Sequence, residues 1–117
     1  MKITKDYEGL KRIENGDYVL EGDLISDENI EIGLDDRLVV RGSIRSAKSI
    51  IANISMIAGL GIKAGEGIEV NNRIFAGTSV YHNSTNCDKT IKCQRLLKGE
   101  IAYGVLELTK AGARNDA

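Results

Sequence analysis

The 117-residue chain has no proline or tryptophan, only one phenylalanine and one histidine, and aromatic residues make up 4% of it. Few aromatic residues suit a narrow core filled by aliphatic and small side chains. No apolar run approaches the roughly 18 residues of a membrane-spanning helix, and the N-terminus lacks the apolar segment of a signal peptide. We therefore expect a single domain without membrane association, in the cytoplasm of a bacterial host.

An excess of charge of one sign is also missing. The 16 basic and 17 acidic residues leave a net charge of −1, so the chain lacks the basic footprint of a nucleic-acid-binding protein. There are only two cysteines, Cys87 and Cys93, and we expect both to be reduced in a cytoplasmic protein. Direct binding of nucleic acid is therefore not expected.

What the chain has is an aliphatic residue at every sixth position through most of its length. These positions are Leu38, Ile44, Ile50, Met56, Ile62, Ile68, Ile74 and Val80. Two residues after each comes a second position, small in most units: Val40, Ser46, Ala52, Ala58, Ala64, Val70, Ala76 and His82. The spacing also joins Tyr18, Leu24 and Ile30, and two residues are inserted near Asp35 and Asp36 before it resumes. Such repeats usually form a binding surface rather than a catalytic cleft.

The spacing within each unit predicts a short β-strand followed by a corner. Side chains at i and i+2 lie on one face of a strand, and Gly-, Asn- and Ser-rich segments such as Gly42-Ser43 and Asn71-Asn72 suit tight corners. A helix is disfavoured, because a period of six does not match 3.6 and Gly recurs every few residues. The sequence therefore predicts an all-β, three-faced β-solenoid over residues 17–82, with about four coils of about 18 residues each.

The N-terminal segment differs from the repeat and is expected to cap it. Residues 4–15 begin with the N-cap candidate Thr4 and carry an apolar stripe that includes Tyr7 and Leu10, and Gly16 is a suitable stop. This pattern predicts a short helix, within an N-terminal cap of residues 1–16, that covers the first coil and its open strand edges.

The C-terminal segment is expected to form a second cap. Residues 83–109 contain two strand-like runs, at 90–93 and 101–108, with a turn at 96–100 between them, which predicts a β-hairpin, or paired strands, that closes the last coil. The solenoid domain would then span residues 1–109. Residues 110–117 are small and polar, and we expect a disordered tail there.

Each unit has one outward side chain between its two inward ones, and sorting these by coil gives three stacks. The first contains Val19, Val39, Ile57 and Phe75; the second Ile25, Arg45, Lys63 and Tyr81; the third Glu31, Ile51 and Glu69. A continuous apolar row on a soluble protein usually marks an interface, although strand propensity alone also favours β-branched residues there. We expect this row to be covered by a second copy, a partner protein or the C-terminal segment. The predicted interface residues are Val19, Val39, Ile57, Phe75 and Tyr81.

Side chains with catalytic or metal-binding chemistry are few. His82, Cys87 and Cys93 could offer three zinc ligands, but their spacing matches no zinc pattern and a fourth ligand is missing. Nothing identifies an orienting group or oxyanion feature for a Cys–His nucleophile. Hexapeptide acyltransferases place a small residue two before the aliphatic one, where this chain has residues such as Lys48 and Glu66. We therefore expect no enzyme activity, no cofactor and no metal site.

The repeat resembles that of bactofilins, on the basis of the motif Ile-x-Ala-Gly-x-Gly at residues 62–67. The resemblance covers residues 18–82 and implies a right-handed solenoid and self-assembly into a scaffold. Self-assembly of that kind needs solenoid ends that can abut, whereas both ends of this chain are expected to be covered.

A likeness that spans nearly the whole chain is to small repeat proteins of gut Firmicutes, their phages and mobile elements. It rests on residues 73–77, the polar loop after them, the Lys/Cys strand and the ending at 99–104. This likeness implies an inhibitor that binds a host defence protein, such as a CRISPR-Cas effector, as a homodimer or a monomer. The alternative is a bactofilin-like scaffold that assembles end to end.

Overall fold

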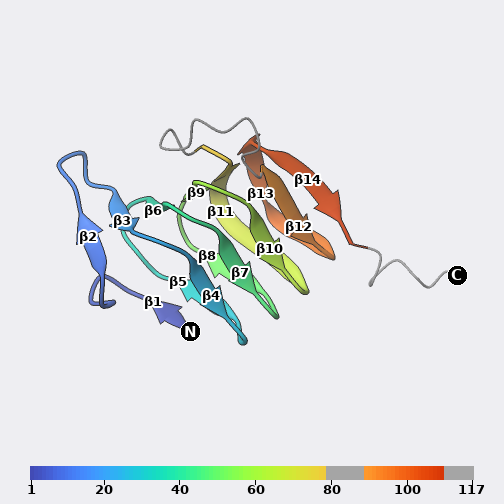
Figure 1. Ribbon diagram of the computed structural model, residues 1–117, viewed down its shortest axis with the longest axis horizontal. Helices are drawn as coiled ribbons and strands as arrows, with labels where there is room; N and C mark the ends of the chain where they lie inside the picture. Colours follow the sequence, from blue (N-terminus) through green and yellow to red (C-terminus); the bar gives the residue numbers. More distant parts are fainter. Residues whose placement is uncertain (79–88, 110–117) are drawn as a thin grey trace, which may run out of the picture.

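A computed structural model describes residues 1–78 and 89–109, which form short β-strands and no helix. Figure 1 shows the strands side by side along the long axis of the molecule, from the N-terminal end at the left to the C-terminal end at the right. The strands are β1 (Lys2–Ile3), β2 (Leu10–Arg12), β3 (Tyr18–Leu20), β4 (Leu24–Ser26), β5 (Ile30–Ile32), β6 (Leu38–Val40), β7 (Ile44–Ser46), β8 (Ile50–Ala52), β9 (Met56–Ala58), β10 (Ile62–Ala64), β11 (Gly67–Ala76), β12 (Thr90–Cys93), β13 (Arg95–Tyr103) and β14 (Val105–Leu108). The protein is all-β in its described part, as predicted.

Most strands of the repeat pair in parallel with the third strand further along the chain, as β3 does with β6 and β6 with β9. One curled sheet has the order β1-β5-β8-β11-β9-β6-β3-β2, and β13 also pairs with β11; the other has the order β14-β12-β10-β7-β4. The long strand β11 contributes to the first sheet twice, because its first half pairs with β8 and its second half with β9. The pairings that span Asp35 and Asp36, such as Tyr18 with Leu38, accommodate the insertion that the sequence predicted.

The inward positions of the repeat fill the core. Leu38, Met56 and Ile74 lie in register on adjacent strands, as predicted, and all three are fully buried. The small residues Ala58 and Ala76 lie beside each other two positions further on, and are buried as well. Complete burial of an aliphatic side chain stabilises the fold by roughly 1.5–3 kcal/mol. The recurring aliphatic positions are therefore the main source of stability in this narrow core.

Polar side chains at the corners bond to backbone groups that the strands leave unpaired. Asn53 donates from Nδ2 to the carbonyl of Leu34 at 2.9 Å and accepts at Oδ1 from the Leu34 amide at 3.0 Å. The buried Ser46 hydroxyl donates to the carbonyl of Glu28 at 2.7 Å and accepts from the Lys48 amide at 3.0 Å. The bonds to Leu34 and Glu28 join corners that are distant in sequence but adjacent in the stack, and so help to hold the strands in register.

The predicted N-terminal helix over 4–15 is wrong. The segment makes tight turns instead, in which the amide of Tyr7 donates to Thr4 and the amide of Leu10 donates to Tyr7. Leu10 then begins β2, which pairs antiparallel with β3. An isolated helix this short is marginal, whereas the free edge of β3 offers β2 a full set of backbone hydrogen bonds. The segment still covers the core, because Tyr7 and Leu10 are half-buried against it.

The predicted C-terminal β-hairpin is also wrong, although a strand at 90–93 is confirmed as β12. The strand predicted at 101–108 is interrupted at Gly104, and its second part, β14, pairs with β12 in parallel rather than antiparallel. The expected turn at 96–100 lies within β13, which runs alongside β11 through two register shifts before Glu100 and one after Ile101. Residues 90–109 thus continue the stack by parallel pairing, because their aliphatic side chains align with those of the preceding strands.

Candidate functional site

The residues of the predicted apolar row are aligned on adjacent strands in the structure, but Val19 is buried there and not exposed as predicted. Val19 pairs with Val39, Val39 with Ile57, and Ile57 with Phe75 on adjacent parallel strands. Tyr103 of β13 pairs with Phe75 and lengthens the row by one strand. We call these five residues the apolar stripe. Their placement follows the prediction, while their role as an interface remains a proposal.

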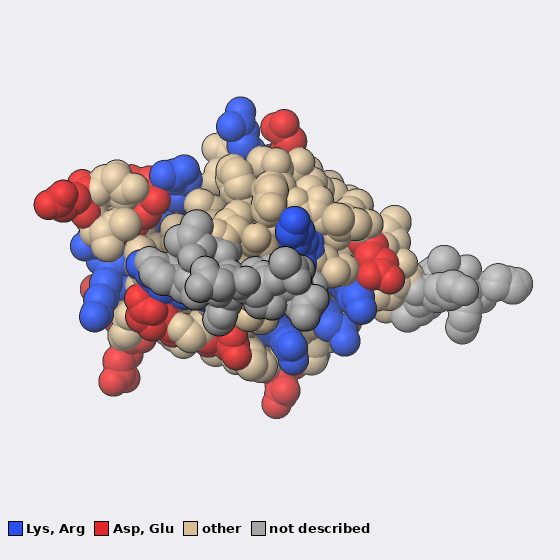
Figure 2. Space-filling view, turned by 45° about the horizontal axis from the view of Figure 1, so that its top comes forward, with Lys and Arg blue, Asp and Glu red and all other residues tan. Residues whose placement is uncertain are grey.

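Exposure of the apolar stripe increases toward the C-terminal end. Val19 is 4% exposed, Val39, Ile57 and Phe75 are half-buried, and Tyr103 is 44% exposed. The space-filling view, in which the top of Figure 1 comes forward, shows a broad area without charged side chains on this side (Figure 2). The accessible part of the stripe is therefore its C-terminal part, around Phe75.

The sequence did not indicate Tyr103 as part of the stripe. A register shift between Ile74 and Phe75 places Ile101 opposite Ile74 and Tyr103 opposite Phe75, with one residue of β13 bulged out. A strict six-residue count does not anticipate that bulge. The signal in the sequence was the pair of Ile101 and Tyr103. On β11 the inward Ile74 and the outward Phe75 are adjacent, whereas on β13 the corresponding two residues are separated by one bulged residue.

Tyr81, the fifth predicted interface residue, lies outside the described residues, as do Val80 and His82. The place beside Lys63 that the sequence assigned to Tyr81 is held by Lys92, because β12 is the strand that pairs with β10 on that side. The second outward stack therefore continues with a lysine rather than a tyrosine.

With Lys92 in this place, three basic side chains form a row. Arg45, Lys63 and Lys92 lie in register on β7, β10 and β12, beside a shallow groove of about 280 Å³. Like charges directly opposite one another destabilise neighbouring strands. Glu107 of β14 is 4.0 Å from Lys92 and offsets part of this repulsion. The row leaves one face of the molecule locally basic although the chain as a whole is nearly neutral.

A polar cluster forms where the two extra residues enter the repeat. The Tyr18 hydroxyl donates to Asp35 at 2.5 Å, and the Arg12 guanidinium lies 5.0 Å from the centre of the Tyr18 ring. The hydrogen bond from Tyr18 lowers the pKa of Asp35, and the same bond raises the pKa of Tyr18. Arg12 lies 3.9 Å from Asp35 and 4.0 Å from Asp36. The cluster joins β2 to the rest of the stack and has the character of a structural contact.

The residues weighed for zinc binding or nucleophilic chemistry are not brought together in the described part of the chain. Cys93 is fully buried, and burial raises the pKa of its thiol, which disfavours the reactive thiolate. His82 and Cys87 lie outside the described residues. Within residues 1–78 and 89–109 no group of three His, Cys, Asp or Glu side chains has a geometry that could hold a metal ion.

Comparison of the chain with protein-family models, curated proteins and solved structures finds no match. The described residues include no helix that is long and apolar enough to cross a membrane. The arrangement of side chains is thus the main guide to function, and its distinctive features are surfaces: the apolar stripe, the basic row, and the exposed strands at the C-terminal end.

Proposed function

We propose that the chain is a non-catalytic, protein-binding β-solenoid that docks a partner protein on its apolar stripe. In this proposal the coils have three walls, formed by the columns β3-β6-β9, β4-β7-β10-β12-β14 and β1-β5-β8, with β11 and β13 each bent across two walls. The parallel pairing of each repeat strand with the third strand after it supports such coils. We retain the right-handed winding that the bactofilin resemblance implies.

The observation that carries the binding proposal is the in-register alignment of Val39, Ile57 and Phe75, the three half-buried residues of the stripe, on neighbouring strands. A contiguous row of partly accessible apolar side chains is typical of an interaction site. A central aromatic residue is a common anchor of a protein interface, and Phe75 is the only phenylalanine of the chain.

The specific form that we propose is a phage or mobile-element inhibitor that binds a host defence protein, such as a CRISPR-Cas effector, in the bacterial cytoplasm. The likeness to small repeat proteins of that origin supports this choice, as does the compact size of 12.7 kDa. No enzymatic step is involved, since inhibition follows from covering a surface of the target.

The alternative is a self-assembling scaffold. Within the described residues the outer edges of β13 and β14 have no strand partner, which favours this alternative, because unpaired edges can recruit further chains. The antiparallel β2 opposes it at the other end, where it covers the edge of β3 with a strand of the wrong direction for continuing the parallel stack.

The binding proposal is tested with the full chain immobilised and exposed to purified CRISPR-Cas effectors, one at a time, with affinity measured by biolayer interferometry. We expect Phe75→Asp to weaken binding to the recognised effector by at least about 100-fold, since removal of an interface anchor costs about 2–4 kcal/mol. The matched control is Ile25→Asp, an exposed apolar position on β4, away from the stripe. Binding to none of the effectors, or equal affinity of Phe75→Asp and wild type, would contradict the proposal.

A further inference from the structure

The C-terminal end of the stack exposes both strand edges and apolar side chains. The described pairings of β13 are to β11 alone and those of β14 are to β12 alone, so the outer edge of each strand is free within the described part of the chain. Of the exposed large apolar side chains in residues 1–78 and 89–109, more than half are found here: Leu97, Tyr103, Val105, Leu106 and Leu108. Free edges with apolar side chains pair readily with another strand.

We propose that this end binds the same end of a second copy of the chain, with the two β13 strands paired antiparallel about Gly99. A two-fold axis perpendicular to the stack turns one end onto the other and makes the facing strands antiparallel, as an isologous interface requires. The dimer surface shares Tyr103 with the stripe but does not include Phe75, the proposed anchor of partner docking, so this inference does not rest on the proposed function.

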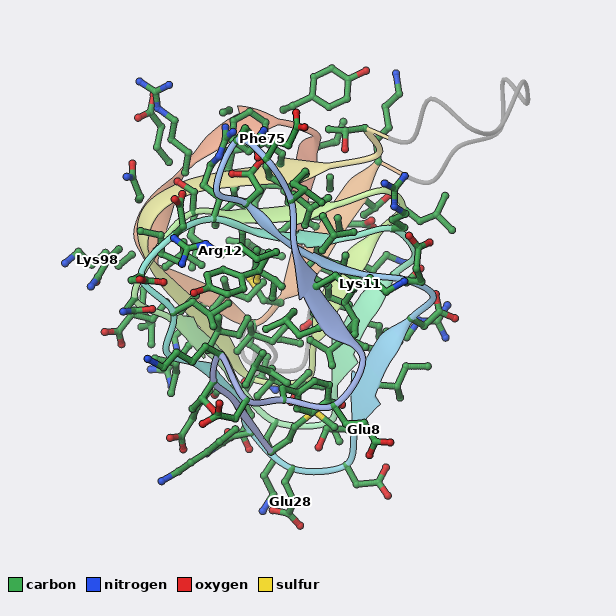
Figure 3. The ribbon with its side chains drawn as sticks, turned by 90° about the vertical axis from the view of Figure 1, so that its left-hand side faces the viewer. Glu8, Lys11, Arg12, Glu28, Phe75 and Lys98 are labelled. Atoms are coloured by element: carbon green, nitrogen blue, oxygen red, sulfur yellow. The ribbon has the colours of Figure 1, made fainter. Side chains whose placement is uncertain are left out.

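The charges of β13 complement one another across such an axis. Lys98 and Glu100 flank Gly99, so pairing about Gly99 places each Lys98 opposite the partner's Glu100, and the contact occurs twice. Arg95 then faces the partner's Tyr103, whose ring already has Nζ of its own Lys89 at 5.5 Å from the ring centre. Figure 3 shows Lys98 at the side of the molecule with its side chain extended away from the core. Cross-strand pairs of opposite charge stabilise antiparallel strands.

Gly99 itself suits the point where the two backbones meet. Its φ is 130°, a conformation that L residues rarely adopt, and a Cβ there would lie 2.8 Å from Cδ1 of Ile74. The chain therefore needs glycine at this corner of the stack.

The same axis pairs the two β14 strands. An axis through the corner at Gly99 passes through the middle of the opposite wall, between Leu106 and Glu107. Val105 then faces the partner's Leu108. Val105 is 62% exposed and Leu106 is 37% exposed in the single chain, so the pairing removes apolar surface from water where most of it is available. The two-fold axis uses the C-terminal end of both copies, so the pairing itself stops at a dimer; at the far end β2 covers the edge of β3, and β4 is the last strand of its sheet.

The test is the oligomeric state of the full chain, measured by size-exclusion chromatography with light scattering over a dilution series. Wild type should have twice the 12.7 kDa mass of one chain. Lys98→Glu places a carboxylate opposite each Glu100 carboxylate across the axis, and should raise the dissociation constant by at least about 100-fold, because like charges across an interface cost several kcal/mol. The double variant Lys98→Glu/Glu100→Lys restores opposite charges and should recover the dimer.

Two further variants separate this end from the rest of the surface. Val105→Lys should disperse the dimer, and Ile25→Lys, at an exposed apolar position on β4, should leave it intact. Glu100 also lies 3.8 Å from Arg73 of its own chain, but both side chains are largely exposed, so that pair contributes little. Phe75→Asp should leave the dimer intact, so failure of this proposal and failure of partner docking on the stripe are distinguishable.

The proposal is overturned if wild type is a monomer at every concentration or forms long polymers. It is equally overturned if Lys98→Glu remains a dimer, if the charge-swapped double variant stays monomeric with a wild-type circular-dichroism spectrum, or if Ile25→Lys disperses the dimer as well as Val105→Lys does.

Discussion

The two ends of the stack are built from the same kind of short strand but are finished differently. At the N-terminal end β1 pairs with β5 and β2 pairs with β3, and the amino group of Met1 donates to the Asn29 carbonyl at 2.8 Å. At the C-terminal end β13 and β14 are the last described strands, and five large apolar side chains are exposed there, against Met1, Ile13 and Ile25 at the N-terminal end. The comparison shows that each repeat strand offers an edge on which the next one can pair, whereas covering the last edge requires a segment of different sequence.

The N-terminal cover depends on charge as well as on backbone pairing. Arg12 of β2 approaches Asp35 and Asp36 and lies over the Tyr18 ring. Figure 3 looks onto this end and shows β2 crossing in front of the core, with Lys11 and Arg12 on it. At the C-terminal end Lys89 lies 5.5 Å from the centre of the Tyr103 ring and Lys92 lies 4.0 Å from Glu107, and neither contact involves a strand that covers the end. The difference between the ends is therefore a difference in stability and in association, and both can be measured.

The largest difference should appear on truncating one core residue at each end. Ile3 of β1 is fully buried, so Ile3→Ala should lower the free energy of unfolding by about 2–5 kcal/mol. Leu106 of β14 is partly exposed, so Leu106→Ala should cost about 1 kcal/mol. Urea denaturation, followed by circular dichroism in the Lys98→Glu background, measures both losses without a contribution from dimer formation. Equal losses would show that the C-terminal end is as well covered as the N-terminal end.

An intermediate effect is expected at the ion pair between the buried Asp17 and the half-exposed Arg37 in the N-terminal half. Asp17 is buried and accepts two hydrogen bonds of 3.0 Å from the Arg37 guanidinium. Asp17→Ala should lower the free energy of unfolding by about 1–3 kcal/mol, because charge-assisted bonds to a buried acceptor are lost. The control is Glu21→Ala, which removes the partner of Arg41 in a more exposed pair and should cost less than about 1 kcal/mol. A larger loss for Glu21→Ala than for Asp17→Ala would contradict this ranking.

The smallest effect expected is a dependence of stability on pH at the Tyr18–Asp35 contact. The hydrogen bond lowers the pKa of Asp35, so its contribution is present above the ordinary aspartate pKa and is lost as pH falls through the lowered value. The bond raises the pKa of Tyr18, so that contribution is present below the ordinary tyrosine pKa and is lost as pH rises through the raised value. Denaturation midpoints across the acid and alkaline ranges measure both changes.

Tyr18→Phe is the matched control for that series, since it keeps the ring and removes the hydroxyl. The variant should show a weaker dependence on pH in both ranges than wild type. Identical profiles for Tyr18→Phe and wild type would show that the contact does not contribute to folding.

The register of the repeat strands could be predicted because the positions of the aliphatic side chains identify the inward face of each strand. An aliphatic residue every six positions identifies the inward face, and Leu38, Met56 and Ile74 pair as that spacing requires. The extra residues at Asp35 and Asp36 were visible as a break in the spacing, and the structure accommodates them between the paired strands β3 and β6. The outward stripe followed from the same count.

The ends could not be predicted in the same way, since tertiary pairing decides them. The pattern of Tyr7 and Leu10 suits one face of a helix, but the free edge of β3 gives the segment better hydrogen bonding as a strand. The run from Arg95 to Tyr103 contains Gly99, which resembles a hairpin turn; its glycine instead lets one strand bend around a corner. Local sequence does not distinguish a bend that continues a stack from a turn that reverses it.

The most direct test of the account is the neighbourhood of Met56, one of only two methionines in the chain. With its methyl group labelled selectively, nuclear Overhauser effects to the side chains of Leu38 and Ile74 report whether β9 lies between β6 and β11. We expect strong effects to both residues, because Met56 pairs with each of them in the core. Effects confined to the immediate sequence neighbours of Met56 would contradict the stacked arrangement.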